Sequence, residues 1–140
     1  MKKQFVTYEI ALKLKELNFD ESTRFGNETS LYNNKGLHIF YYNYGVMMSG
    51  CDDGYIKAPL WQQAIDFIRE KYGYVIYITE IGENKSLYTY TIEIKDHSLY
   101  PIDELYSAYF GDLHETYYQA REQAILYTLE LIKNKQCNNQ

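Results

Sequence analysis

The chain of 140 residues is acidic, with 19 Asp and Glu against 14 Lys and Arg and a formal net charge of −5. This length and a hydrophobic fraction of 46% are typical of one folded domain, and they exclude disordered, collagen-like and coiled-coil classes. No apolar run is long enough to cross a membrane, and the acidic balance disfavours binding to a phosphate backbone. We therefore expect a cytoplasmic protein with one hydrophobic core.

The first predicted element is a helix over residues 7–17. Its apolar residues follow helical spacing, and Thr7 is a suitable N-cap. Asn18, directly after it, suits the left-handed conformation that ends many helices. The polar residues 20–30 then predict a loop.

A hairpin is predicted next in the chain. Strands over residues 31–33 and 37–42 flank the run Asn34-Lys35-Gly36, whose glycine tolerates the positive φ of a tight turn. Residues 43–57 are rich in glycine and aspartate and predict an irregular segment, with a short strand at 46–48.

The clearest predicted helix covers residues 59–72. Pro59 suits the first helical position, because no N–H is needed there, and Gly73 stops the helix. Trp61, the single tryptophan, shares its face with the isoleucines of this helix. We therefore expect Trp61 to be largely buried in the core rather than to anchor a partner.

A second hairpin is predicted from strands over residues 74–81 and 87–95, around the turn 82–86. Because side chains alternate between the two faces of a strand, one side of this hairpin is apolar. That side carries Tyr74, Ile76, Ile78, Tyr90, Ile92 and Ile94. We expect helices to cover this face only.

The last part of the chain predicts a short edge strand and a helix. The strand is expected near residues 105–109. Thr116 and Gln119 form a capping-box pattern, and the helix that they begin reaches about Lys133. The polar residues 136–140 predict a frayed tail.

The resulting order of elements is α-β-β-α-β-β-(β)-α. Strands come in hairpins rather than alternating singly with helices, which predicts an antiparallel sheet. The expected fold is therefore α+β, an antiparallel sheet built of hairpins with helices packed on one face, in a single domain over residues 1–135.

Two runs of the sequence are distinctive. They are Pro59-x-Trp61-Gln62-Gln63-Ala64-Ile65-Asp66 and Tyr118-x-Ala120-Arg121-Glu122-Gln123-Ala124-Ile125. Together with the opening helix, they resemble a family of small uncharacterised proteins found in gut bacteria and in their phages and mobile elements. The resemblance implies a phage-related or mobile-element context, and it implies no activity and no binding residue.

The sequence contains no recognisable metal or cofactor motif. His38, His97 and His114 lack the spacing of metal ligands, and no glycine-rich phosphate loop leads into a capped helix. The run Cys51-Asp52-Asp53 offers a thiolate and two carboxylates, but an Asp-Asp-Gly turn explains the same residues. We therefore predict no metal site, no cofactor and no catalytic residue.

Tyrosine is unusually frequent, at 17 residues. A recognition surface explains this frequency, because tyrosine supplies a large contact area at low entropic cost. A coding bias also explains it, since Ile outnumbers Val 13 to 3 and Lys outnumbers Arg 11 to 3. If tyrosine serves recognition, the candidate interaction surface is Tyr41, Tyr42 and Tyr44.

Three hypotheses about function follow. The leading one is a non-enzymatic protein-interaction or regulatory factor that binds another protein, or a second copy of itself, through a tyrosine-rich acidic surface. An alternative is a nucleic-acid-binding module, because residues 59–133 follow the element order of double-stranded-RNA-binding domains. A second alternative is a small enzyme that uses His97, Glu93 or Cys51.

Overall fold

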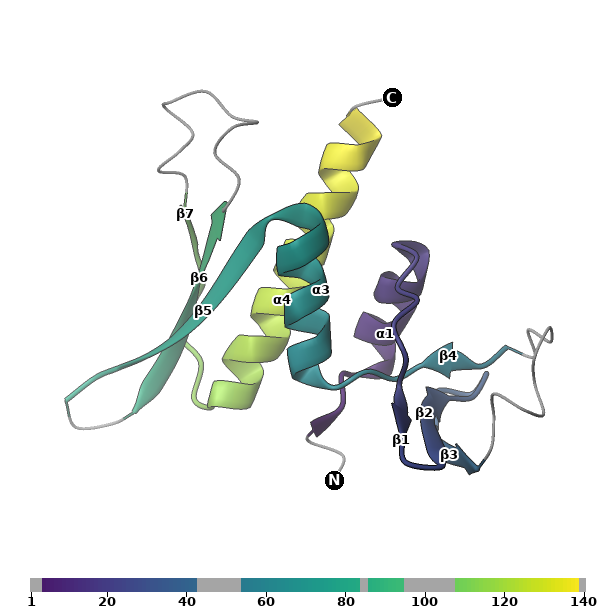
Figure 1. The fold of residues 1–140 in the computed structure, drawn as a ribbon. Coiled ribbons are helices and arrows are strands. Elements are labelled where there is room, and N and C mark those ends of the chain that lie inside the picture. Colours follow the sequence, from purple (N-terminus) through teal and green to yellow (C-terminus); the bar gives the residue numbers. More distant parts are fainter. Residues whose placement is uncertain (1–3, 43–53, 84–85, 95–107, 139–140) are drawn as a thin grey trace. The chain divides into compact units, whose positions relative to one another are not determined.

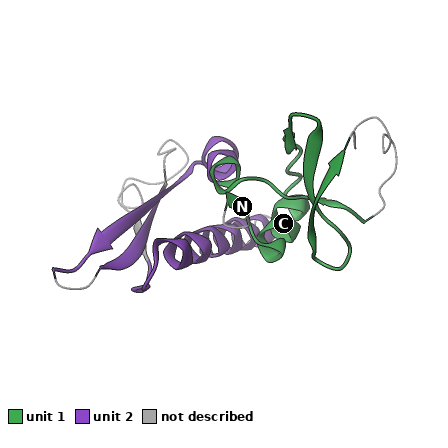
Figure 2. Ribbon diagram, turned by 90° about the horizontal axis from the view of Figure 1, so that it is seen from below, with its two compact units in different colours: residues 1–64 green, residues 65–140 purple. Residues whose placement is uncertain are grey.

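The computed structural model describes residues 4–42, 54–83, 86–94 and 108–138, and it confirms an α+β fold with antiparallel sheets (Figure 1). The chain divides into two compact units, unit 1 over Met1–Ala64 and unit 2 over Ile65–Gln140 (Figure 2). The boundary falls inside helix α3 (Trp61–Tyr72), and each unit has its own sheet. That residues 1–135 act as a single domain stays a prediction.

Helix α1 (Tyr8–Glu16) forms as expected in unit 1. The hydroxyl of Thr7 accepts a hydrogen bond from Ile10 N at 3.3 Å and caps the helix. Asn18 has a φ of 62°, and Phe19 N donates to Leu14 O at 3.0 Å. The left-handed asparagine therefore ends the helix, as the sequence predicts.

The sheet of unit 1 is larger than the predicted hairpin. Its strands are β1 (Arg24–Phe25), β2 (Glu28–Tyr32), β3 (His38–Tyr42) and β4 (Ile56–Lys57). The order is β1-β2-β3, with β4 also pairing β2, and the β2–β3 turn contains Gly36 at a φ of 78°. The predicted strand at 46–48 lies outside the described residues.

The prediction of a loop over residues 20–30 is wrong in part, because β1 and the start of β2 lie there. The buried Thr23 explains the difference. Its hydroxyl donates to Ser30 O at 2.8 Å, and Ser30 N donates to Thr23 O at 2.9 Å. These bonds hold a polar segment in the core, which hydrophobic periodicity does not indicate.

Helix α3 begins at Trp61 and not at Pro59. The Pro59 carbonyl accepts instead from Val6 N at 2.9 Å, and the Gln63 side chain accepts from Leu60 N at 2.9 Å. The backbone of Pro59 thus pairs with the segment before α1. Trp61 is 7% exposed, which confirms its predicted burial.

The sheet of unit 2 contains β5 (Tyr74–Ile81), β6 (Leu87–Ile94) and β7 (Ala108–Phe110) in the order β5-β6-β7. Across the hairpin, Ile76 lies opposite Ile92 and Ile78 opposite Tyr90, so the predicted apolar face is correct. Strand β7 overlaps the last two residues of the expected strand at 105–109, and residues 105–107 lie outside the described residues.

Helix α4 (Tyr117–Asn138) packs against β5 and β6 (Figure 1). The capping box is present, because Gln119 N donates to the Thr116 hydroxyl at 3.1 Å and Thr116 N to the Gln119 side chain at 3.3 Å. The helix continues past the predicted end at Lys133 to Asn138. That the tail at 136–140 is frayed stays a prediction.

Candidate interaction surfaces

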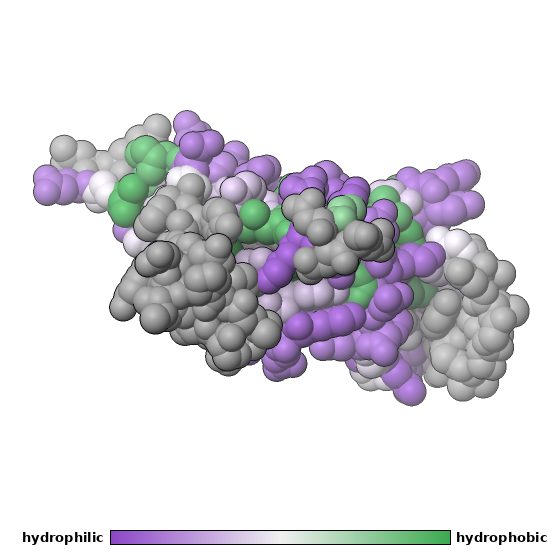
Figure 3. Space-filling model, turned by 90° about the horizontal axis from the view of Figure 1, so that it is seen from above, coloured by the Kyte–Doolittle hydropathy of each residue, from purple (hydrophilic) through white to green (hydrophobic). Residues whose placement is uncertain are grey.

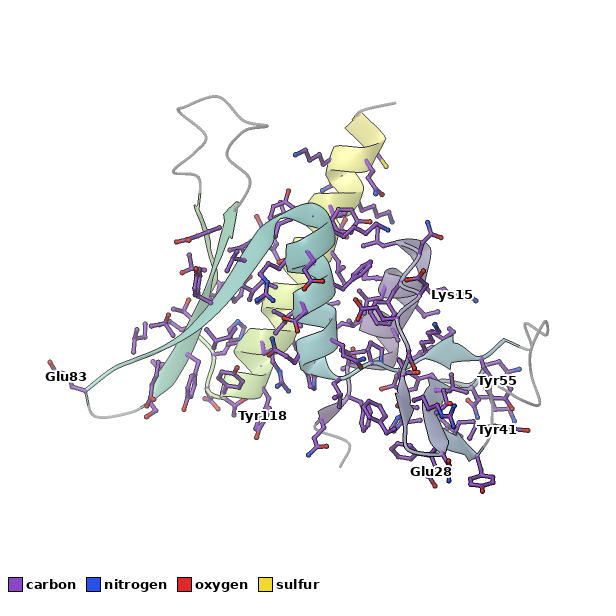
Figure 4. The ribbon with its side chains drawn as sticks, in the orientation of Figure 1. Lys15, Glu28, Tyr41, Tyr55, Glu83 and Tyr118 are labelled. Atoms are coloured by element: carbon purple, nitrogen blue, oxygen red, sulfur yellow. The ribbon has the colours of Figure 1, made fainter. Side chains whose placement is uncertain are left out.

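The structure describes two of the three tyrosines of the predicted interaction surface, and they differ in exposure. Tyr42 is 61% exposed at the end of β3. Tyr41 is half-buried, and its ring meets that of Tyr55 edge-on at a centroid distance of 5.9 Å (Figure 4). Tyr44 lies outside the described residues. A binding role for these three residues stays a prediction.

Aromatic rings on the face of β3 opposite Tyr41 pack together inside unit 1. The buried Phe5 ring lies 4.6 Å from His38, 5.6 Å from Phe40 and 5.9 Å from Phe25, measured between centroids. The pairs with Phe40 and Phe25 are edge-to-face, a geometry that adds to the stability that burial provides. The rings therefore attach the segment before α1 to the sheet.

Ser30 and His38 form a close pair that resembles a catalytic dyad only in composition. His38 Nε2 lies 2.6 Å from Ser30 Oγ. The Ser30 hydroxyl donates its single hydrogen to Ala58 O at 2.8 Å, so its oxygen accepts a hydrogen bond from the N–H of His38 Nε2. A nucleophilic serine must instead donate to its base. With Ser30 fully buried, this pair stabilises the sheet.

Of the residues that the enzyme hypothesis names, the structure describes Glu93. Glu93 is exposed on β6, whereas Cys51 and His97 lie outside the described residues. The ring of His114 stacks on Tyr90 at 6.3 Å. Within the described ranges, no three His, Cys, Asp or Glu side chains lie close enough together to hold a metal ion.

Unit 2 carries most of the exposed tyrosines. Among the described residues, the exposed tyrosine side chains are Tyr42 in unit 1 and Tyr77, Tyr117, Tyr118 and Tyr127 in unit 2. Two of these lie next to each other at the start of α4, where the sequence run Tyr117-Tyr118 is visible but carries no signal that distinguishes it from other tyrosine pairs.

We define the α4 aromatic cluster as Tyr88, Tyr117, Tyr118 and Arg121. The Arg121 guanidinium lies 5.3 Å from the Tyr118 ring centroid and 5.6 Å from that of Tyr117. The Tyr117 ring meets Tyr118 at 6.0 Å and Tyr88 at 6.2 Å, both edge-on. Arg121 follows Tyr118 by three residues and Tyr117 by four, so the three side chains lie on the same side of α4.

Partial burial lowers the pKa of Arg121, and the phenol groups of Tyr117 and Tyr118 act in the opposite direction. The guanidinium is therefore partly removed from water while it stays charged. A surface that combines tyrosine rings with a partly desolvated arginine has the composition of protein-binding hot spots. The Tyr118 side chain points away from the helix at its N-terminal end (Figure 4).

The ring of Tyr90, on β6, packs directly against Gly111, a glycine that the sequence does not single out. A Cβ atom built on Gly111 would lie 2.1 Å from Tyr90 Cε1, and Gly111 N donates to Tyr90 O at 2.9 Å. Burial raises the pKa of Tyr90, and the negative charges of Tyr127 and Asp112 raise it further. Tyr90 is therefore a core residue, in contrast to its exposed neighbours on α4.

The charge of the chain is divided unequally between the two units. Unit 2 contains twelve Asp and Glu against seven Lys and Arg, whereas unit 1 contains seven of each. The whole net charge of −5 thus belongs to unit 2. On the face drawn in Figure 3, hydrophobic residues form separate areas among hydrophilic ones, and one of these areas lies over the β5–β6 hairpin.

Comparison of the chain with family models, curated proteins and solved structures finds no match. Of the helices in the described ranges, none combines the length and the apolar character that crossing a membrane requires.

Proposed function

We propose that the protein is a non-enzymatic protein-interaction factor that binds its partner through unit 2, with the α4 aromatic cluster at the centre of the contact. One observation carries this proposal: the exposed tyrosine pair with its arginine lies in the unit that holds the whole net charge. Tyrosine and arginine are enriched in binding hot spots, and a one-sided charge favours partners of the opposite sign. The phage-related or mobile-element context that the sequence resemblance implies stays a prediction.

The nucleic-acid alternative has one observation in its favour. The elements α3, β5, β6, β7 and α4 follow the order of double-stranded-RNA-binding domains. Unit 2, however, holds the net negative charge of the chain, which opposes binding to a phosphate backbone. Element order by itself does not establish function. We expect binding to duplex RNA or DNA at physiological salt to be about 10⁻⁴ M or weaker. A submicromolar dissociation constant would favour the alternative.

Affinity capture from the native host tests the proposal. We would compare the wild-type chain with Tyr118→Ala and with Tyr42→Ala, which removes an exposed tyrosine from unit 1. Circular dichroism would first establish that both variants are folded. We expect one specific partner. Its affinity should fall by about tenfold or more for Tyr118→Ala and stay unchanged for Tyr42→Ala.

The other outcomes contradict the proposal in different ways. Loss of the partner with Tyr42→Ala alone would place the binding surface on β3, where the sequence predicts it. Equal binding by wild type and both variants would show that neither tyrosine contributes. A substrate turned over by the purified chain would overturn the non-enzymatic assignment.

A further inference from the structure

Strand β5 is an outer strand of the unit 2 sheet. Among the described residues it pairs with β6 alone, and its ladder runs without a bulge from Tyr74 opposite Ile94 to Ile81 opposite Leu87 (Figure 1). The side of β5 that faces away from β6 presents a row of backbone N–H and C=O groups. Such a row is a template on which a further strand pairs.

Strand β5 lacks the features that usually protect an outer strand. Proteins block such edges with lysine, with proline or with bulges, and none of these occurs in the eight residues of β5. Its single charged residue is Glu80. Tyr77, at 49% exposure, and Ile81 are exposed on the face opposite the buried Tyr74 and Tyr90. Nothing in the sequence of β5 therefore prevents an apolar strand from pairing with this edge.

The charge around this edge indicates what kind of strand fits. Residues 74–95 of the sequence contain three glutamates and two lysines, and the single charged residue of β5 is Glu80. Glu80 and Glu83 are both exposed, and Glu83 projects from the hairpin tip (Figure 4). The charge on β5 itself is therefore negative, as is the net charge of unit 2, which favours a basic segment over a second copy with the same charges.

We propose that the outer edge of β5 binds an extended basic segment of a partner protein, which joins the sheet as an additional strand. This inference rests on the proposed function, because it assumes that unit 2 binds a protein. Side chains alternate along β5, with Tyr77 and Ile81 on one face and Glu80 on the other. The segment that fits therefore alternates apolar residues with lysine or arginine, and backbone hydrogen bonds hold it in register.

A synthetic peptide tests this proposal on the full chain. The probe is an acetylated and amidated nonapeptide that alternates lysine with valine. One control peptide replaces lysine by glutamate. A second control has the same sequence but carries a backbone N-methyl group on every residue, which removes the N–H donors from both edges of the strand without changing the charge. Binding is measured by isothermal titration calorimetry at low and at physiological salt, and the bound site by amide hydrogen exchange.

Two variants of equal charge change locate the contact. Thr79→Lys adds a positive charge to an exposed position of β5, whereas Leu113→Lys adds one at a 55% exposed position outside β5. We expect Thr79→Lys to weaken binding of the lysine peptide about tenfold, which is ~1.4 kcal/mol of binding free energy. Leu113→Lys should change the dissociation constant by about twofold at most. The β5 amides should gain protection from exchange when the peptide binds.

Each other result contradicts the proposal. Equal binding of the N-methylated peptide would show that charge alone attracts the probe and that no strand is added. A concentration-dependent dimer in sedimentation, abolished by Thr79→Lys, would make a second copy the occupant of the edge. Absence of peptide binding, with a captured partner that still depends on Tyr118, would overturn this inference and leave the proposed function intact.

Discussion

The two units use their polar and aromatic side chains in different ways. In unit 1, hydroxyl groups bond to backbone carbonyls across the fold: Ser30 donates to Ala58 O, and Tyr32 donates to Val6 O. In unit 2, the buried Thr128 donates to Ala124 O within its own helix, and the half-buried Thr89 donates to Gly111 O. The hydroxyls of Ser30 and Tyr32 in unit 1 thus link distant segments, whereas the buried hydroxyl of Thr128 stays within α4, which packs against the β5–β6 hairpin.

The same contrast holds for the aromatic rings and the charge. Phe5 packs among the rings of unit 1 and fixes a backbone segment, while Tyr117 and Tyr118 surround an arginine on the outside of unit 2. Unit 1 has no net charge and unit 2 has all of it. The comparison teaches that tyrosine frequency alone does not indicate a binding surface. The position of the rings and the charge beside them do.

The largest expected effect is in unit 1. Trp61→Ala should lower the free energy of unfolding by about 3–5 kcal/mol, because a buried indole is lost and a cavity forms. Circular dichroism in urea is the measurement, since the variant has no tryptophan fluorescence. An unchanged urea midpoint would mean that Trp61 contributes nothing to the core.

The matching test in unit 2 is Gly111→Ala. The added methyl group would meet the buried Tyr90 ring at 2.1 Å, so we expect a loss of about 1–3 kcal/mol from overpacking. Thermal unfolding followed by circular dichroism measures it. In a Tyr90→Leu background, Gly111→Ala should lower the free energy of unfolding by less. If the effects of the two substitutions simply add, the contact with the ring is not the cause.

The helix caps compare the two units at a smaller scale. Thr7→Ala removes the hydroxyl that accepts from Ile10 N, and Thr116→Ala removes the one that accepts from Gln119 N. Each should destabilise the protein by about 1 kcal/mol in urea unfolding. Serine at the same positions keeps the acceptor and should restore most of the stability. No rescue by serine would exclude capping as the explanation.

The smallest expected effect is a loss of stability at alkaline pH. Burial raises the pKa of Tyr32 in unit 1 and of Tyr90 in unit 2 above the ordinary value of 10.0. The unfolded chain therefore ionises these tyrosines first, so their contribution is complete below pH 10 and is lost as the pH rises through the raised pKa values. The urea midpoint should fall above pH 10, and less steeply in Tyr90→Phe. The same slope in both chains would contradict the assignment to Tyr90.

The elements that the sequence predicts well are those with strong periodicity or clear end signals. Thr7, Asn18 and Thr116 mark their helices correctly, because capping depends on residues next to each other in the chain. The apolar face of the β5–β6 hairpin follows from alternation alone. The class α+β then results from the order of the elements.

The features that the sequence does not indicate depend on contacts between distant residues. Strand β1 and the start of β2 lie in a polar segment held by Thr23 and Ser30, and no periodicity marks such bonds. The start of α3 shifts because Pro59 O pairs with Val6 N. The grouping of Tyr88 with the tyrosines of α4 likewise requires the fold, since nearly thirty residues separate them along the chain.

The burial of the single tryptophan gives the molecule a built-in optical reporter. Trp61 is shielded from water and lies in unit 1, so its emission reports on that unit, at short wavelength when folded and at longer wavelength when solvent reaches the indole. Tyrosines absorb at shorter wavelengths and transfer excitation energy to a nearby indole. Exciting at two wavelengths therefore follows, in one unlabelled sample, both the environment of the indole and the compactness of the rings around it.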